Sequence, residues 1–402
     1  MITNTRKKEV TKLAYLFAVT YMISYMTRIN FGAIVSEMET NTGIARSLLS
    51  MSLTGSFITY GAGQIISGVA GDRISPKRLV SIGLLATILM NLIIPLCQNP
   101  YQMLAVWCVN GFAQSFMWPP IVKLMVAMFD SDEYKYASVR VQWGSSFGTM
   151  GIYLIAPLLI ALFSWRAVFW FSALSGLIGL LIWNRFIQEP ENMPVQKKGS
   201  STDATRHLFT PLMFGVMAAI IMMGMLRDGV TTWMPSYIAE TYNLSNIVSI
   251  LTGVALPVFS ILCCRGTEAL YRQKLRNPLL CAGSIFAVGT CAALLLFFLF
   301  NQGAAMSVFL AALLTGSMHG VNFMLISMLP PFFKKYGNTS TASGILNACT
   351  YIGSALSTYG IALLSKGIGW SWTILIWFMI ALIGTALCLI CVKPWAKAHS
   401  ES

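Results

Sequence analysis

The stretch LAYLFAVTYMISYMTRINFGAIV (Leu13–Val35) is long and apolar enough to cross a lipid bilayer, yet it contains Arg28. Arg227 lies in a second apolar stretch, Leu208–Tyr237, about half the chain length later. A guanidinium in hydrocarbon costs at least ~2.5–3.5 kcal/mol and cannot lose its proton, so it must face a cavity or a partner. The same residue at the matching place in each half predicts a duplicated membrane protein that binds an anion between its halves.

The composition of the chain is that of a membrane protein. Hydrophobic residues make up 56% and charged residues 10%, and the mean hydropathy is +0.68. Apolar stretches of the ~17–25 residues that span a bilayer recur along the whole chain. They lie near 13–35, 47–70, 79–97, 101–129, 138–163, 166–187, 208–239, 247–264, 278–300, 304–330, 339–365 and 370–392. We therefore expect an all-α membrane protein with twelve transmembrane helices in two pseudo-symmetric six-helix bundles.

One polar segment divides the chain near its midpoint. Residues 188–207 are rich in Pro, Ser and Gly, which is typical of a linker. The sequence thus predicts an N-terminal bundle at 1–187, a cytoplasmic linker at 188–207 and a C-terminal bundle at 208–402. The other loops are short, and the spans contain no pattern of nucleophile and base, so we expect a protein that is not an enzyme.

The net charge of +13 follows from membrane topology. If both termini are cytoplasmic, most of the 27 lysines and arginines fall in cytoplasmic segments, as the positive-inside rule requires. We therefore expect cytoplasmic termini, a bacterial inner membrane and no nucleic-acid partner. The nine cysteines lack the spacing of a zinc site, so no metal or cofactor is expected.

A charged loop after the second span carries a family motif. The string Gly68-Val-Ala-Gly-Asp72-Arg73-Ile-Ser-Pro-Lys77-Arg78 resembles the signature G-x-x-x-D-R-x-G-x-[RK]-[RK] of the major facilitator superfamily, with Ser75 in place of a glycine. In that family the Asp and the basic residues are thought to latch helix ends on the cytoplasmic side. The resemblance therefore implies the major facilitator fold and a gating role for Gly68, Asp72, Arg73, Lys77 and Arg78.

Three further strings point to a subfamily. They are Tyr21–Phe31 in the first predicted helix, Asn110–Lys123 in the fourth and Leu226–Tyr237 in the seventh. Together they look like the organophosphate:phosphate antiporter family, which exchanges glycerol 3-phosphate and hexose phosphates for inorganic phosphate. The resemblance implies that Arg28 and Arg227 bind phosphate, and two guanidinium forks suit a dianionic group. The resemblance and the helical spacing together indicate further candidate substrate-binding residues. They are Tyr21, Tyr25, Tyr60, Gln64, Ser145, Lys123, His319 and Asn347.

Some candidates also have a structural interpretation. Lys123 either extends its charge to the membrane interface or steers the substrate. His319 and Asn347 either line the pocket or form hydrogen bonds between helices. Asp228 is the one acidic residue that lies deep in a predicted span, and it either pairs with Arg227 or couples transport to protons.

The chain departs from the antiporter family at the expected pocket. Gln64 stands where a lysine is found, Ser145 where a histidine is found, and Gly224 where a tyrosine is found, while Asp228 adds a negative charge. The pocket is therefore less positive, and we expect the smaller residues to open space for a larger sugar.

These departures leave three functions open. They are an antiporter that exchanges a phosphate ester for inorganic phosphate, a proton-coupled symporter of a sugar acid or other carboxylate, and a membrane sensor of sugar phosphates. The expected partners are a small anion, inorganic phosphate and the lipid bilayer, and the protein is expected to be a monomer.

Overall fold

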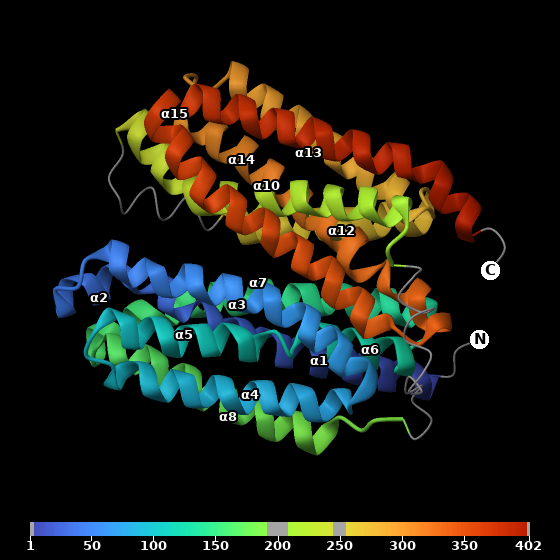
Figure 1. Ribbon diagram of the computed structural model, residues 1–402, viewed down its shortest axis with the longest axis horizontal. Coiled ribbons are helices and arrows are strands. Elements are labelled where there is room, and N and C mark those ends of the chain that lie inside the picture. The colour runs from blue at the N-terminus through green and yellow to red at the C-terminus, as the bar shows by residue number, and fades with distance from the viewer. Residues whose placement is uncertain (1–3, 191–207, 244–254, 400–402) are drawn as a thin grey trace. The chain divides into compact units, whose positions relative to one another are not determined.

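The computed structural model describes residues 4–190, 208–243 and 255–399, in which every regular element is a helix (Figure 1). The prediction of an all-α protein is confirmed. The predicted linker lies outside the described residues from position 191 onward, and so does the beginning of the predicted eighth span, up to position 254.

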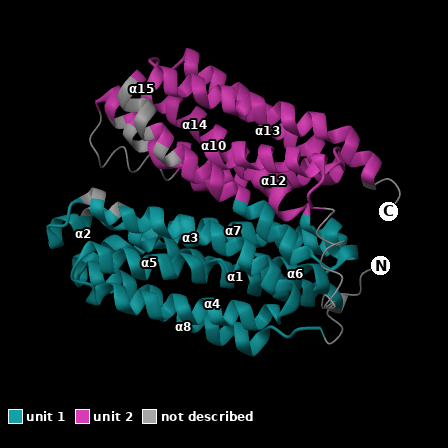
Figure 2. Ribbon diagram, in the orientation of Figure 1, with its two compact units in different colours: residues 1–201, 330–348 teal, residues 202–329, 349–402 magenta. Residues whose placement is uncertain are grey.

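The chain forms two compact units (Figure 2). Unit 1 contains residues 1–201 together with 330–348, and unit 2 contains residues 202–329 and 349–402. The segment 330–348, which the sequence places in the second bundle, therefore packs with unit 1.

Unit 1 is a helical bundle in which helices distant in sequence pair closely. Helix α1 packs on α7, α3 on α5, and α4 on α8 (Figure 1). A Cβ atom on Gly144 would lie 2.3 Å from the Ala18 carbonyl oxygen, so this glycine is what lets α7 approach α1. The elements of unit 1 are α1 (Asn4–Ala33), α2 (Val35–Thr42), α3 (Arg46–Arg73), α4 (Pro76–Ile93), η1 (Ile94–Leu96), α5 (Pro100–Gln114), α6 (Trp118–Met128), α7 (Ser131–Leu162), α8 (Trp165–Phe186), η3 (Pro330–Tyr336) and the start of α15 (Thr339–His399).

The predicted fourth span, 101–129, consists of two helices, α5 and α6. Pro119 and Pro120 have no N–H group to continue the hydrogen-bond ladder from α5. The carbonyl of Ser115, four residues before Pro119, instead accepts a hydrogen bond from Gln64 Nε2 of α3 at 3.3 Å. The break is thus stabilised by a side chain from a neighbouring helix, as broken helices inside a membrane require.

Unit 2 is built around α14, which packs against α10, α12 and α13. After α14 the chain forms a short π-helix, η2, of a kind often found at functional sites. Gly369, with φ of 81° and ψ of 172°, is not helical, so it divides α15 into two helices that correspond to the last two predicted spans. The elements are α10 (Pro211–Tyr242), α12 (Ala255–Gln273), α13 (Pro278–Phe298), α14 (Ala304–Asn322), η2 (Phe323–Ser327) and the remainder of α15.

Seven helical segments among the described residues are long and apolar enough to cross a membrane. Large apolar side chains stand exposed on their outer faces, such as Leu154, Leu158 and Phe163 at the end of α7. Such side chains favour contact with lipid. The segments are Pro76–Leu96, Ser131–Leu162, Trp165–Phe186, Pro211–Met234, Pro278–Phe298, Ala304–Tyr336 and Ile368–Ala398.

Replacing Gly344 with alanine is expected to destabilise unit 1, because α3 and the start of α15 touch there through their backbones. A Cβ atom on Gly344 would lie 2.2 Å from the Gln64 carbonyl oxygen and 3.0 Å from Gly68 Cα. Forcing the two helices apart should cost about 1–3 kcal/mol, measured as a lower melting temperature in detergent. Gly151→Ala is the matched control, since no atom lies within 4 Å of its Cβ position. Equal melting temperatures for the two variants would contradict this contact.

Candidate functional site

Arg28 of α1 lies against tyrosine rings in unit 1. Its guanidinium carbon is 4.2 Å from the ring centroid of Tyr25 and 4.8 Å from that of Tyr60, which comes from α3. The Tyr21 ring continues the cluster, 5.1 Å from the Tyr25 ring and 5.3 Å from that of Trp118. Four predicted site residues are therefore brought together, and the ring faces partly stabilise the charge of Arg28.

A buried polar network sets the rotation of α1 about its axis. Ser24 Oγ donates to Gln114 Oε1 at 2.9 Å, and Gln114 Nε2 donates to Thr27 Oγ1 at 2.9 Å. Asn30 Nδ2 donates to Asn91 Oδ1 at 2.7 Å. These bonds attach one face of α1 to α4 and α5, which fixes the direction of the face that carries Arg28. Ser24, Thr27 and Asn30 are spaced at one helical turn, which is the only sign of this network in the sequence.

Gln64, Asn347 and Ser145 each have a protein partner in unit 1. Asn347 Nδ2 donates to Gln64 Oε1 at 3.0 Å, so two predicted site residues are bonded to each other. Ser145 Oγ donates to the Gln142 carbonyl at 2.7 Å within its own helix, α7. Their roles in substrate binding stay predictions.

Arg227 of α10 is held by its neighbour in sequence, Asp228. Arg227 Nε donates to Asp228 Oδ1 at 2.7 Å, and Nη2 donates to Oδ2 at 2.8 Å, which is a bidentate ion pair. Arg227 Nη1 donates to Asn322 Oδ1 at the end of α14, at 3.0 Å. Ser354 of α15 donates its hydroxyl to Asp228 Oδ2. Side chains from three helices therefore meet at this ion pair.

Other groups surround the Arg227–Asp228 pair. His319 lies one turn before Asn322 on α14 and interacts electrostatically with both members of the pair. The Tyr351 ring of α15 lies 6.0 Å from the Arg227 guanidinium carbon. The π-helix η2 begins directly after Asn322.

The expectation that Gly224 opens space in the pocket is wrong. A Cβ atom on Gly224 would lie 2.2 Å from the Thr350 carbonyl oxygen. The missing side chain is therefore replaced by the backbone of α15, which packs directly on α10. A small residue inside a membrane bundle permits close helix contact as readily as it creates a cavity.

The motif residue Asp72 binds the beginning of α15. Its Oδ1 accepts the N–H of Ser340 at 3.0 Å, and its Oδ2 accepts the N–H of Thr341 at 2.7 Å. A carboxylate at a helix N-terminus satisfies unpaired N–H groups and is favoured by the helix dipole. Gly68, one turn earlier, lets α15 approach, because a Cβ there would lie 2.8 Å from the Ser340 carbonyl oxygen.

Lys123 of α6 is buried beside this contact. Its Nζ donates to the carbonyls of Gly71 and Asp72 at 2.9 and 3.1 Å, and it lies 3.8 Å from Asp72 Oδ1. Although Lys123 belongs to α6, its ammonium group lies at the C-terminus of α3, where the helix dipole favours a positive charge. Lys123 is 5% exposed, so it does not extend its charge to the membrane interface, and its role in steering the substrate stays a prediction.

Ser75, the departure from the motif, begins α4. Its Oγ accepts the N–H of Arg78 at 3.1 Å and donates to the carboxylate of Glu189 at 2.8 Å. Glu189 also accepts the N–H of Lys77 at 2.7 Å. The serine therefore caps a helix, a role for which glycine has no side chain. The side chains of Arg73 and Arg78 are exposed.

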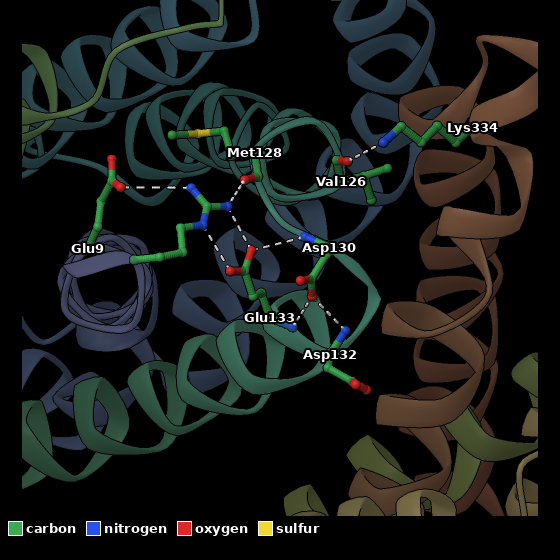
Figure 3. Close-up of polar contacts among 8 residues, drawn as sticks. Glu9, Val126, Met128, Asp130, Asp132, Glu133 and Lys334 are labelled. Carbon is green, nitrogen blue, oxygen red and sulfur yellow. Dashed lines mark hydrogen bonds and ion pairs between the residues drawn. The ribbon is translucent and has the colours of Figure 1, made fainter. Parts of the chain in front are cut away.

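Two cations contact the end of α6 (Figure 3). Arg6 donates to both carboxylate oxygens of Glu133, at 2.9 and 2.7 Å, and to the Met128 carbonyl at 3.0 Å. Lys334 of η3 donates to the Val126 carbonyl at 3.0 Å. The hydrogen bonds to Glu133 raise the pKa of Arg6, so the guanidinium stays charged. These contacts, for which the sequence shows no distinctive pattern, satisfy carbonyl groups at the end of a helix.

The described part of the chain contains no group of three or more His, Cys, Asp or Glu residues that could hold a metal ion. Arg28 and Arg227 carry guanidinium groups, which can donate hydrogen bonds to an anion.

The sequence is similar to a known family and to individual proteins of known name. The model of the family described as Major Facilitator Superfamily matches residues 17–358. The membrane sensor protein UhpC of Salmonella typhimurium is 22% identical, and the match covers 94% of this chain and 90% of that protein. A probable hexose phosphate transport protein of Chlamydia trachomatis is 21% identical, covering 97% of this chain and 92% of that protein.

The fold also matches a solved structure. The proton:xylose symporter XylE, bound to 6-bromo-6-deoxy-D-glucose, superimposes with a TM-score of 0.77 at 12% identity, and the match covers 96% of each chain. At this identity the similarity shows the fold alone.

Proposed function

The chain belongs to the major facilitator superfamily, and from that premise we propose that it is a secondary transporter that exchanges a small phosphate ester for inorganic phosphate. The substrate class is a sugar phosphate or glycerol phosphate. The main support is that Arg28 lies on tyrosine rings inside an apolar helix of unit 1, and Arg227 lies within a polar cluster inside an apolar helix of unit 2. An arginine inside a membrane-spanning helix is rare, and it usually marks a substrate or ion pathway. The similarity to a probable hexose phosphate transport protein of Chlamydia trachomatis adds support.

The transport cycle follows from the family. The two bundles alternate between access to either side of the membrane, and the substrate anion binds Arg28 and Arg227. We place the protein in a bacterial inner membrane as a monomer with both termini in the cytoplasm, because the distribution of lysine and arginine favours that orientation.

One observation favours a second candidate, a proton-coupled symporter of a sugar acid. Asp228 already neutralises the charge of Arg227. A site that contains this carboxylate therefore suits a singly charged carboxylate substrate better than a site without it would. A third candidate is a membrane sensor of sugar phosphates, because the Salmonella relative is named a membrane sensor protein.

Exchange in proteoliposomes tests the proposal. Vesicles that hold the purified protein are loaded with labelled phosphate and challenged outside with glycerol 3-phosphate, hexose phosphates or sugar acids. Release of label that requires an external phosphate ester and persists with an uncoupler is the expected result. Sugar-acid uptake that needs an inward proton gradient, without phosphate release, would replace the proposal with the symporter. Binding of esters without any transport would favour the sensor.

A further inference from the structure

Helix α7 carries one arginine on an otherwise apolar outer face. Spacings of three, four and seven residues place six side chains along one line of the helix, and the last three of them are more than half exposed. Exposed apolar side chains on a membrane-spanning helix favour contact with lipid. Arg140 therefore lies on the lipid-facing side of α7, near the first turns of the helix. The six side chains are those of Tyr136, Arg140, Trp143, Phe147, Leu154 and Leu158.

The guanidinium of Arg140 lies one turn nearer the beginning of α7 than its own Cα atom. Arg140 Nη1 donates to the Tyr136 carbonyl at 2.9 Å, and the guanidinium carbon is 3.1 Å from the Tyr136 ring centroid and 5.7 Å from that of Trp143. A helix of 32 residues is about 48 Å long, so a hydrocarbon core of ~30 Å centred on α7 would leave about 9 Å at each end. Tyr136 comes about 7.5 Å after Ser131, the first residue of the helix. The charge is thus at the depth of the lipid phosphate groups.

Arg140 has hydrogen-bond donors for which the protein supplies no acceptor. Its Nε atom is buried and bonds to no acceptor in the described part of the chain. The bond from Nη1 to Tyr136 is the one hydrogen bond that this side chain forms with described residues, and it forms no ion pair with them. The ring faces stabilise part of the charge, but a guanidinium has five N–H groups and keeps its proton. Because the side chain is only half-buried, its outer N–H groups are within reach of an acceptor from the surroundings of the helix.

The neighbouring helix α1 adds positive charge on this side. The Tyr136 hydroxyl lies 3.4 Å from Thr11 Oγ1 of α1. Lys8 precedes Thr11 by three residues, so it lies on the same side of α1, and it is exposed. The acidic side chains at the beginning of α7 already have partners in the protein, so they do not cancel this charge. They are Asp130 with two backbone N–H groups and Glu133 with Arg6 (Figure 3), and Asp132 with Lys135.

We propose that Arg140 binds the phosphodiester group of an anionic phospholipid in the leaflet where α7 begins. The guanidinium donates to the charged phosphate oxygens, and the acyl chains follow the apolar line that starts at Phe147. Basic groups between membrane-spanning helices bind acidic lipid head groups in this way, and Tyr and Trp side chains such as Tyr136 and Trp143 favour the membrane interface. A zwitterionic lipid is disfavoured, because Lys8 and Arg140 repel the ammonium group of its head group.

The first measurement is lipid binding by the wild-type protein, purified in a neutral detergent and freed of bound lipid. The protein is titrated with phosphatidylglycerol, phosphatidylcholine or diacylglycerol, and the bound lipids are counted by native mass spectrometry. Phosphatidylglycerol should bind about tenfold more tightly than phosphatidylcholine. Diacylglycerol, which has no phosphate, should bind more weakly than either. Equal binding of the three lipids would overturn the proposal.

The second measurement compares variants of two arginines. In Arg140→Gln the affinity for phosphatidylglycerol should fall about tenfold or more, and the preference over phosphatidylcholine should disappear. Arg140→Lys should keep part of the preference, because an ammonium group retains the charge but not the fork of donors. Arg185→Gln is the matched control, since it removes an exposed arginine from the last turn of α8. An equal loss in Arg140→Gln and Arg185→Gln would show attraction by general surface charge and would contradict a site at Arg140.

The control arginine lies at the same end of the bundle as the proposed site. The residue after Arg185, Phe186, receives the Lys12 ammonium of α1 over its ring at 5.7 Å. Lys12 directly follows Thr11, which contacts Tyr136 of α7. Both arginines are therefore exposed to the same leaflet, so the comparison separates a specific site from the charge of the membrane surface.

Soluble phosphate compounds separate a lipid site from a site for a free anion. Inorganic phosphate and glycerol 3-phosphate should not displace phosphatidylglycerol, because they lack the acyl chains that contact the apolar line of α7. Displacement by either compound would assign Arg140 to a soluble anion and overturn the lipid proposal. The wild-type comparison of the three lipids decides the question even if Arg140→Gln does not fold. Lipid binding here does not depend on which anion is transported, so a failure of phosphate exchange would leave the site at Arg140 unaffected.

Discussion

Arg227→Lys is expected to abolish exchange while leaving the protein inserted in the membrane. The guanidinium contacts Asp228 through two nitrogens and Asn322 through the third. A lysine has one compact ammonium group, which cannot span these partners and also present a fork to phosphate. A hydrogen bond to a charged group contributes about 1.5–3 kcal/mol, so losing the two parallel bonds to phosphate should lower the exchange rate by about a hundredfold or more.

The same change at Arg28 should have the same result for a different reason. The planar guanidinium lies on the rings of Tyr25 and Tyr60, and an ammonium group neither stacks in this way nor binds phosphate with two parallel hydrogen bonds. Exchange would be measured per amount of protein in the vesicles. Arg166→Lys is the control, because Arg166 contacts the Pro95 carbonyl and the Trp165 ring and belongs to no candidate site. Full activity in either Arg28→Lys or Arg227→Lys would contradict the proposed binding of the anion by both arginines.

The features that the sequence predicted well depend on hydrophobicity or on local spacing. Long apolar runs predicted the helices, and the spacing of Tyr21, Tyr25 and Arg28 predicted that their side chains share one face of a helix, where the structure places them together. The charged motif predicted a contact of Asp72 with a helix end, and Asp72 does bind the beginning of α15. Each of these inferences needs only the periodicity of a helix or a short string of residues.

The features that the sequence did not predict depend on which helices become neighbours. Pro119 and Pro120 are visible in the sequence, but the use of Gln64 to satisfy the carbonyl before them requires α3 to pack beside the break. Gly224 could have marked a cavity or a close contact, and only the position of Thr350 decides between the two. Ser354 binds Asp228, but a single serine in an apolar helix forms no pattern from which this contact could be predicted.

Asp72→Asn is expected to release the beginning of α15 from α3. The two N–H groups of Ser340 and Thr341 bond to different carboxylate oxygens of a fully buried side chain. An asparagine replaces one of these oxygens with an NH₂ group, so one N–H loses its acceptor and faces another donor. Lys123 also loses its negatively charged neighbour at 3.8 Å. A buried donor without a partner costs about 1–3 kcal/mol, and the unpaired charge adds to this.

Amide hydrogen exchange measures this release directly. The free energy of opening at Ser340 and Thr341 should fall by about 2–4 kcal/mol, so their exchange should become about 30 to 1,000 times faster. Asp132→Asn is the matched control, because its carboxylate is largely exposed and pairs only with Lys135 in the described chain, and such a surface pair contributes at most about 1 kcal/mol. The double variant Asp72→Asn/Lys123→Met should recover part of the protection, because it also removes the uncompensated buried cation. Unchanged exchange at Ser340 and Thr341 in Asp72→Asn would mean that the carboxylate does not hold α15, and the motif would then need another role in this chain.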